Sequence, residues 1–146
     1  MGKIYITGDC HGDFKKIEIV CHQYKTTCED VMIILGDAGI NFYLSKWDKR
    51  NKSLLANMEI TFLCIHGNHE ARPESLDTYK EKMWNGGSVY FEEEYPNILF
   101  AKDGEIYELN GKKVNTLKVQ MHKEKRGVTH VSSLFALSNI LKLVVE

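Results

Sequence analysis

Three short polar clusters hold the residue types in this chain that are best suited to chemistry. They read GDCH at residues 8–11, GDAG at 36–39 and GNHE at 67–70. Their carboxylate, imidazole and amide groups form a mixed set of oxygen and nitrogen donors. Such a set suits Mn, Fe, Zn or Ni better than Ca, which prefers oxygen ligands alone. The clusters therefore predict a site for divalent transition-metal ions, if the fold brings them together.

Each cluster follows an apolar run with the character of a buried strand. Strands are expected over residues 3–7, 31–35 and 60–65, and helices are expected between them over residues 13–25 and 46–58. Strands that alternate with helices predict an α/β fold with a parallel sheet and right-handed crossovers. The clusters recur at intervals of about 30 residues, the length of one βαβ unit. All three are therefore expected at the carboxyl ends of the strands, where open α/β sheets bind ligands.

Four residues of these clusters are the candidate metal ligands. Asp9 and His11 are two positions apart, so both side chains can reach one ion if the segment is extended. Asp37 can bridge two ions with its two carboxylate oxygens, and Asn68 can bind the second ion without adding charge. Two divalent ions would outweigh the charge of two aspartates and leave the site suited to a phosphate. Ions about 3.5–4 Å apart can hold both the attacking and the leaving oxygen of an in-line displacement.

The residues around these ligands have more than one interpretation. His69 is a candidate general acid that protonates the leaving alcohol. Glu70 either holds that imidazole in one tautomer or caps the following turn. Arg72 either reaches a phosphate oxygen or is simply exposed. Cys10 is expected to face the core, since no other feature of a thiol enzyme accompanies it, and Asp13 is expected to cap the next helix.

The second half of the chain changes pattern. The dipeptide Asn110-Gly111 predicts a two-residue hairpin turn, because both central residues of a type I′ turn need positive φ. The elements expected in this half are a short helix over residues 75–83, strands near 88–91, 97–101, 104–109 and 112–119, and an apolar-rich helix over 132–146.

Length and composition bound the class of protein. The 146 residues are most simply one domain, 1–146, long enough to bury a core. A net charge of −1 gives no sign of a broad nucleic-acid or membrane surface. No apolar run approaches the roughly 20 residues of a membrane span and no signal peptide opens the chain, so a cytoplasmic protein is expected. The four cysteines form no CxxC pair and are expected as reduced thiols.

Together the clusters indicate a family. GDCHGD, GDAG and GNHE resemble, in order and spacing, the first three motifs of the calcineurin-like metallophosphoesterases. The stretch from MWNGGSVYF to ELNGKKV is similar to small bacterial or phage metallophosphatases of that family, and the resemblance covers about residues 3–115. It implies an α/β/β/α sandwich and hydrolysis of a phosphomonoester or phosphodiester by a metal-activated water at a dinuclear site. It also implies His69 and Asp37 as catalytic residues and, as metal ligands, Asp9, His11, Asp37 and Asn68.

One part of the family pattern is absent. The family has two later motifs, Gly-His and Gly-His-Thr/Ser-His, that supply further metal-binding histidines, and this sequence has neither. After Val114 the sequence diverges, so residues 116–146 are expected as a divergent tail and the sandwich as C-terminally incomplete or divergent. His122 and His130 are interpreted as surface histidines of a basic loop. The second metal ion is therefore expected to bind weakly, and a second copy of the chain or the C-terminal helix could cover the incomplete sheet.

These features favour a metallophosphatase whose activity is weakened by the missing ligands, acting on a phosphoester or binding phosphate. The alternative is a catalytically impaired or inactive remnant that binds metal, phosphate or a protein partner. A nucleotide-binding α/β domain ranks last, because neither GxGxxG nor GxxxxGK[ST] is present.

Overall fold

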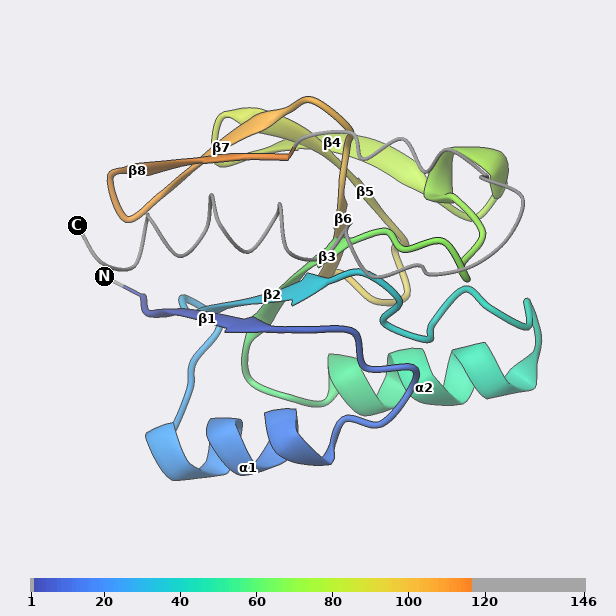
Figure 1. Ribbon diagram of the computed structural model, residues 1–146, viewed down its shortest axis with the longest axis horizontal. Helices are drawn as coiled ribbons and strands as arrows, with labels where there is room; N and C mark the ends of the chain where they lie inside the picture. Colours follow the sequence, from blue (N-terminus) through green and yellow to red (C-terminus); the bar gives the residue numbers. More distant parts are fainter. Residues whose placement is uncertain (1, 117–146) are drawn as a thin grey trace, which may run out of the picture.

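The computed structural model describes residues 2–116 of the chain (Figure 1). The helix predicted over 132–146, the end of the strand predicted over 112–119, and His122 and His130 lie outside the described residues. In chain order the elements are β1 (Ile4–Thr7), α1 (Lys15–Tyr24), β2 (Val31–Leu35), α2 (Lys46–Ala56), β3 (Thr61–Ile65), η1 (Pro73–Ser75), β4 (Lys80–Trp84), β5 (Gly87–Phe91), β6 (Ile98–Ala101), β7 (Ile106–Leu109) and β8 (Lys112–Asn115).

A six-stranded sheet organises these elements, in the strand order β1-β2-β3-β6-β5-β4. The strands β1, β2, β3 and β6 run parallel, whereas β5 and β4 are antiparallel to their neighbours. Every residue of β2 is buried, as its continuous apolar sequence predicts for a strand covered on both faces. The predicted α/β fold with parallel strands is confirmed, and it carries an antiparallel extension at one side.

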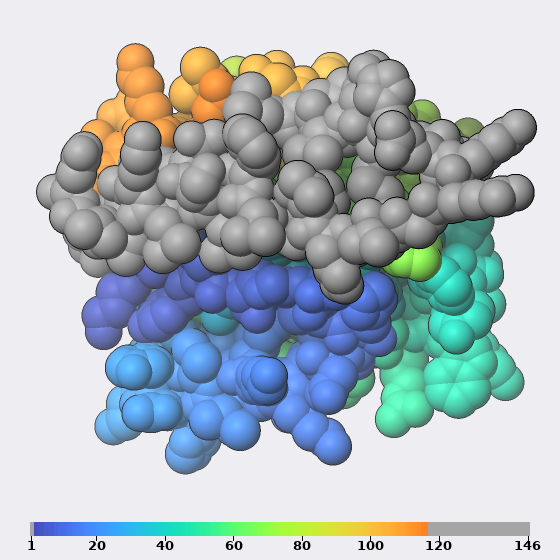
Figure 2. Space-filling model, in the orientation of Figure 1, coloured from blue at the N-terminus to red at the C-terminus, as the bar shows by residue number. Residues whose placement is uncertain are grey.

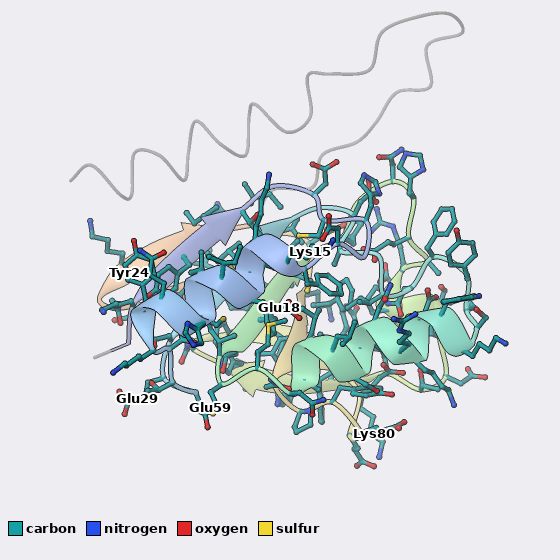
Figure 3. All side chains as sticks on the ribbon, turned by 90° about the horizontal axis from the view of Figure 1, so that it is seen from below. Lys15, Glu18, Tyr24, Glu29, Glu59 and Lys80 are labelled. Atoms are coloured by element: carbon teal, nitrogen blue, oxygen red, sulfur yellow. The ribbon has the colours of Figure 1, made fainter. Side chains whose placement is uncertain are left out.

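Helices α1 and α2 lie side by side over one face of the sheet (Figure 1; Figure 3). Lys15 at the beginning of α1 and Tyr24 at its end are labelled in Figure 3. Between them Ile17 is buried, and Leu55 of α2 is buried in the same core. Apolar side chains of both helices thus attach them to the sheet, and α2 also buries Asp48 and Lys52.

The β7–β8 hairpin forms a small second sheet on the opposite face. It buries Tyr107, Leu109 and Val114 against side chains of the large sheet. Its turn residues, Asn110 and Gly111, have φ angles of 52° and 72°, so the predicted hairpin is confirmed. The helices, in blue and teal, and the hairpin, in orange, lie on opposite sides of the molecule (Figure 2). The described residues therefore form three layers: helices, large sheet and small sheet.

The short helix predicted over residues 75–83 is wrong. The chain forms a 3₁₀ helix at Pro73–Ser75 and the edge strand β4 at Lys80–Trp84 instead. A two-residue turn at Asn85-Gly86 connects β4 to β5, and its φ angles of 46° and 88° are both positive. This is the same Asn-Gly hairpin signal as in the β7–β8 turn. Pairing with β5 along the whole strand overrides the local helical preference.

Two expectations from composition can be compared with the described residues. Cys10, Cys21, Cys28 and Cys64 are free cysteines in the structure, and of the four only Cys64 is buried. Within residues 2–116 no helix is both long enough and apolar enough to cross a membrane.

Candidate functional site

The three polar clusters follow β1, β2 and β3, which are neighbours in the sheet and run in the same direction. Their carboxyl ends lie at one edge, on the right of Figure 1. The backbone N–H of Gly12 donates to the C=O of Ala38 at 3.0 Å, which joins the first loop to the second. The predicted convergence of the three loops at one sheet edge is confirmed.

Asp9 and His11 meet in the first loop. His11 Nε2 lies 2.9 Å from Asp9 Oδ2, and both side chains are exposed. The segment is not extended, however, because His11 has a φ of 48° and Gly12 a φ of 83°. The condition of an extended backbone, under which the i and i+2 side chains would point to one side, is therefore not met. A tight turn brings the two side chains together instead.

Asp37 connects all three loops. It is only 7% exposed, and its φ of 36° lies in the left-handed region. Its backbone C=O accepts hydrogen bonds from the N–H groups of Cys10 at 3.1 Å and His11 at 2.8 Å. Its carboxylate Oδ1 accepts the backbone N–H of His69 at 2.9 Å. Asp37 thus fixes the backbone turn that brings Asp9 and His11 together.

Two glycines allow this close packing of the loops. A Cβ atom on Gly67 would lie 2.1 Å from Asp37 Oδ1, far inside van der Waals contact. A Cβ atom on Gly39 would lie 2.3 Å from the backbone N of Gly12. Glycine is therefore required at both positions by the neighbouring loop.

Glu70 anchors the loop that follows β2. Its side chain is nearly buried, at 8% exposure. Its Oε1 accepts the N–H groups of Gly39 at 2.7 Å and Ile40 at 2.8 Å, and its Oε2 accepts that of Ala38 at 3.2 Å. Both predicted roles are wrong, since the carboxylate binds neither the imidazole of His69 nor the following turn. The reason is that the β2 loop presents several backbone N–H groups to it, and a carboxylate is the acceptor best suited to them.

Replacing Glu70 by glutamine is expected to lower the free energy of unfolding by about 2–3 kcal/mol, because the neutral amide loses charge-assisted hydrogen bonds in a buried place. Urea denaturation measures the change. The matched control is Glu74→Gln, which alters an exposed carboxylate whose ion pair with Arg72 spans 3.5 Å. It is expected to change the stability by less than about 0.5 kcal/mol. Equal losses in the two variants would contradict the anchoring role.

A pocket of about 200 Å³ opens beside the loops. Its walls include His11, Asp37, His69 and Glu70. The rings of His11 and His69 meet edge to face, with their centroids 5.9 Å apart. Asn68 is exposed, and its side chain has no hydrogen-bond partner within residues 2–116. Of the predicted site residues, His11, Asp37 and His69 therefore share the pocket, whereas Asp9 and Asn68 lie in the same loops but outside its walls.

Arg72 forms ion pairs in the part of the chain that the structure describes. Its Nη1 donates to Asp103 Oδ2 at 2.9 Å, and this hydrogen bond raises the pKa of the guanidinium. His66 Nδ1 lies 3.6 Å from the other oxygen of Asp103, and burial lowers the pKa of this imidazole. Of the two interpretations of Arg72, the structure favours a partly exposed surface residue over a phosphate ligand.

Two other residues of the first loop have structural roles. Cys10 is partly buried and packs against the core under the helices, as expected. Burial raises the pKa of its thiol to about 11, so the group is protonated at neutral pH and is a poor nucleophile. Asp13 Oδ1 accepts the N–H of Lys15 at 3.2 Å. It therefore supports the beginning of α1 from one position before the N-cap residue, Phe14.

The donors at this edge fit divalent metal ions in chemical type. Among the described residues that line the pocket, two are carboxylates and two are imidazoles, and none is lysine or arginine. A phosphate bound in this pocket would therefore need added positive charge, which metal ions supply. Asp9 and His11 offer a carboxylate and an imidazole that are already in contact. Within residues 2–116, no group of three or more His, Cys, Asp and Glu side chains is arranged to hold an ion. The donor types and the charge thus suit metal, whereas a complete set of ligands is not assembled in this part of the chain.

The parallel sheet with three polar loops at one edge is the arrangement expected from the motif resemblance to metallophosphoesterases. The chain belongs to the calcineurin-like phosphoesterase family, whose model matches residues 2–142. The match extends past residues 3–115, which carry the motif resemblance. Members of this family are generally hydrolases of phosphoesters that use divalent metal ions. Searches among curated proteins and among solved structures found no similar protein.

Sequence reasoning missed several residues at this edge. Phe42 and Tyr43 line the pocket together with the metal-ligand candidates. Asn51 of α2 donates from Nδ2 to the C=O of Gly39 at 2.7 Å. Two adjacent aromatic residues directly after the second cluster could have indicated that this loop lines the site. A single Asn within a polar helix has no feature that would indicate such a role.

Proposed function

We propose that this chain hydrolyses phosphomonoesters or phosphodiesters with divalent metal ions. The observation that carries the proposal is the position of Asp37, which hydrogen-bonds to the loops after β1 and β3 beside a small pocket. Membership of the calcineurin-like phosphoesterase family supports the same reaction.

Asp9, His11, Asp37 and Asn68 are the proposed metal ligands. Mn, Fe, Zn and Ni suit this mixture of oxygen and nitrogen donors. When bound, such ions would supply positive charge for the phosphoryl group and activate the attacking water. Two ions are proposed, the second held more weakly because fewer ligands remain for it.

His69 is the proposed catalytic acid. Water attacks the phosphorus atom and releases a proton to solvent, the bond from phosphorus to the leaving oxygen breaks, and protonated His69 gives its proton to that oxygen, which leaves as an alcohol. The hydrogen bond from its backbone N–H to Asp37 Oδ1 fixes its position. Its exposed ring borders the pocket and can therefore reach a bound substrate.

Hydrolysis of 4-nitrophenyl phosphate is expected to require added Mn²⁺ and to cease after chelation by EDTA. The release of 4-nitrophenolate measures the rate. Circular dichroism of the chelated chain provides the control, because a fold that persists without metal separates loss of catalysis from unfolding. Hydrolysis that is indifferent to both Mn²⁺ and EDTA would contradict the proposal.

The second candidate function is a remnant that binds metal or phosphate without turnover. It is favoured by the lack, within residues 2–116, of a group of three metal-binding side chains. Calorimetry that detects Mn²⁺ binding, combined with no hydrolysis of either a monoester or a diester, would support this function over the first.

Three further expectations, on cellular location, metal identity and self-association, stay predictions. They are a cytoplasmic location, Mn²⁺ as the working ion, and a second copy of the chain that covers the incomplete sheet.

A further inference from the structure

Phe42 and Tyr43 form an exposed aromatic pair at the mouth of the pocket. They are 50% and 66% exposed, although burial of such side chains is normally favourable. Their rings meet edge to face, with centroids 4.6 Å apart and planes at 86°. The Phe42 ring also lies 6.5 Å from the ring of His69. The pair is therefore next to the proposed catalytic acid.

The backbone that carries this pair is held on both sides. Before it, Asn41 is fully buried and its Nδ2 donates to the hydroxyl of Tyr79 at 2.9 Å. After it, Leu44 has a φ of 50°, which is strained for a residue of this size. The N–H of Leu44 donates to Oδ2 of the buried Asp48 at 2.7 Å, which fixes that strained position. Strain held in place beside a pocket is typical of functional loops.

The volume of the pocket indicates what these rings contact. At about 200 Å³ it is smaller than the roughly 300–1,000 Å³ of most small-molecule sites. A phosphoryl group that fills it would leave the rest of the substrate outside. Because Phe42 and Tyr43 stand at the mouth, the group attached to the phosphate would lie against them.

We infer that Phe42 and Tyr43 bind a planar aromatic group carried by the phosphoester, such as an aryl group or a nucleobase. Perpendicular rings leave a ring face open for stacking, and aromatic faces accept planar groups with little dependence on their identity. The inference rests on the proposed function for the position of the phosphate and adds the chemical class of the substrate.

Phosphonates test the inference without any turnover, because their carbon–phosphorus bond does not hydrolyse. Calorimetry with Mn²⁺ present compares phenylphosphonate with methylphosphonate. Phenylphosphonate is expected to bind about tenfold more tightly, and Phe42→Leu and Tyr43→Leu are each expected to reduce that preference. Methylphosphonate should bind all variants equally, since it lacks the ring.

The control variant is Trp47→Leu. Trp47 is also an exposed aromatic residue close in the chain, but it does not line the pocket, and its ring lies 5.9 Å from the guanidinium carbon of Arg50. This variant is expected to keep the full preference for phenylphosphonate. Equal affinity for the two phosphonates in the unchanged chain, or binding of neither, would overturn the inference.

Adenosine 5′-monophosphate distinguishes the two sources of the aromatic group. Weaker binding of this nucleotide in Phe42→Leu would indicate a nucleobase, whereas an effect confined to phenylphosphonate would indicate a simple aryl group. Turnover is measured separately with 4-nitrophenyl phosphate. A preference for phenylphosphonate without turnover would thus contradict the proposed reaction but support the aromatic site.

Discussion

Replacing Asp37 by asparagine is expected to lower Mn²⁺-dependent hydrolysis of 4-nitrophenyl phosphate at least about 100-fold while the chain stays folded. Asparagine has the same shape, and its side-chain oxygen can still accept the N–H of His69. The backbone C=O keeps its bonds to the first loop. Only the negative charge for the metal ion is lost. Residues that merely support metal ligands already contribute 10–100-fold, so Asp37, as the proposed ligand of both ions, should contribute more.

The rate as a function of Mn²⁺ concentration measures this effect, and thermal unfolding checks the fold. Asp103→Asn is the matched control, because Asp103 is a partly buried carboxylate that pairs with Arg72 and does not line the pocket. This variant is expected to retain activity within about twofold, because an ion pair with solvent-accessible partners contributes little to stability. An Asp37→Asn variant with an unchanged Mn²⁺ response would contradict the assignment of Asp37 as a ligand.

Replacing His69 by alanine is expected to lower kcat about 100-fold for phenyl phosphate and much less for 4-nitrophenyl phosphate. Phenolate is a poor leaving group and needs the proton, whereas 4-nitrophenolate leaves readily without one. Both substrates carry a ring, so the aromatic pair at the pocket mouth should treat them alike. Steady-state kinetics with the two substrates measures the difference.

His22→Ala provides the comparison, since His22 is an exposed residue of α1 and lies outside the site. It should leave both rates unchanged. Equal losses for the two substrates in His69→Ala would contradict the role of proton donor and indicate that His69 only positions the phosphate.

The sheet and its functional edge could be predicted from sequence because strong local patterns decide them. The continuous apolar run of β2 requires cover on both faces, and this places the polar residues that follow it at the strand end. The spacing of the clusters then brings the three loops to one edge. The Asn110-Gly111 turn could equally be predicted from sequence, since few other dipeptides adopt two positive φ angles.

The remaining features depend on contacts between distant parts of the chain. The turn at His11 is set by the C=O of Asp37, and the position of Glu70 is set by the N–H groups of the β2 loop. Neither contact leaves a periodic pattern in the sequence. The strand β4 is a different case, because its position could have been predicted. The dipeptide Asn85-Gly86 indicates a hairpin turn, and the prediction of a helix over 75–83 did not take it into account.

The bonds of Asp37 also affect how the domain responds to its ligands. The backbone C=O of Asp37 bonds to the first loop and its carboxylate bonds to the third, so the site should form or dissolve as a unit, not one ligand at a time. An ion or phosphate bound there would favour the folded state of all three strand ends together. Such binding adds about 2.7 kcal/mol to folding stability at a ligand concentration 100 times Kd. Resistance to unfolding would then vary with the supply of metal in the surroundings.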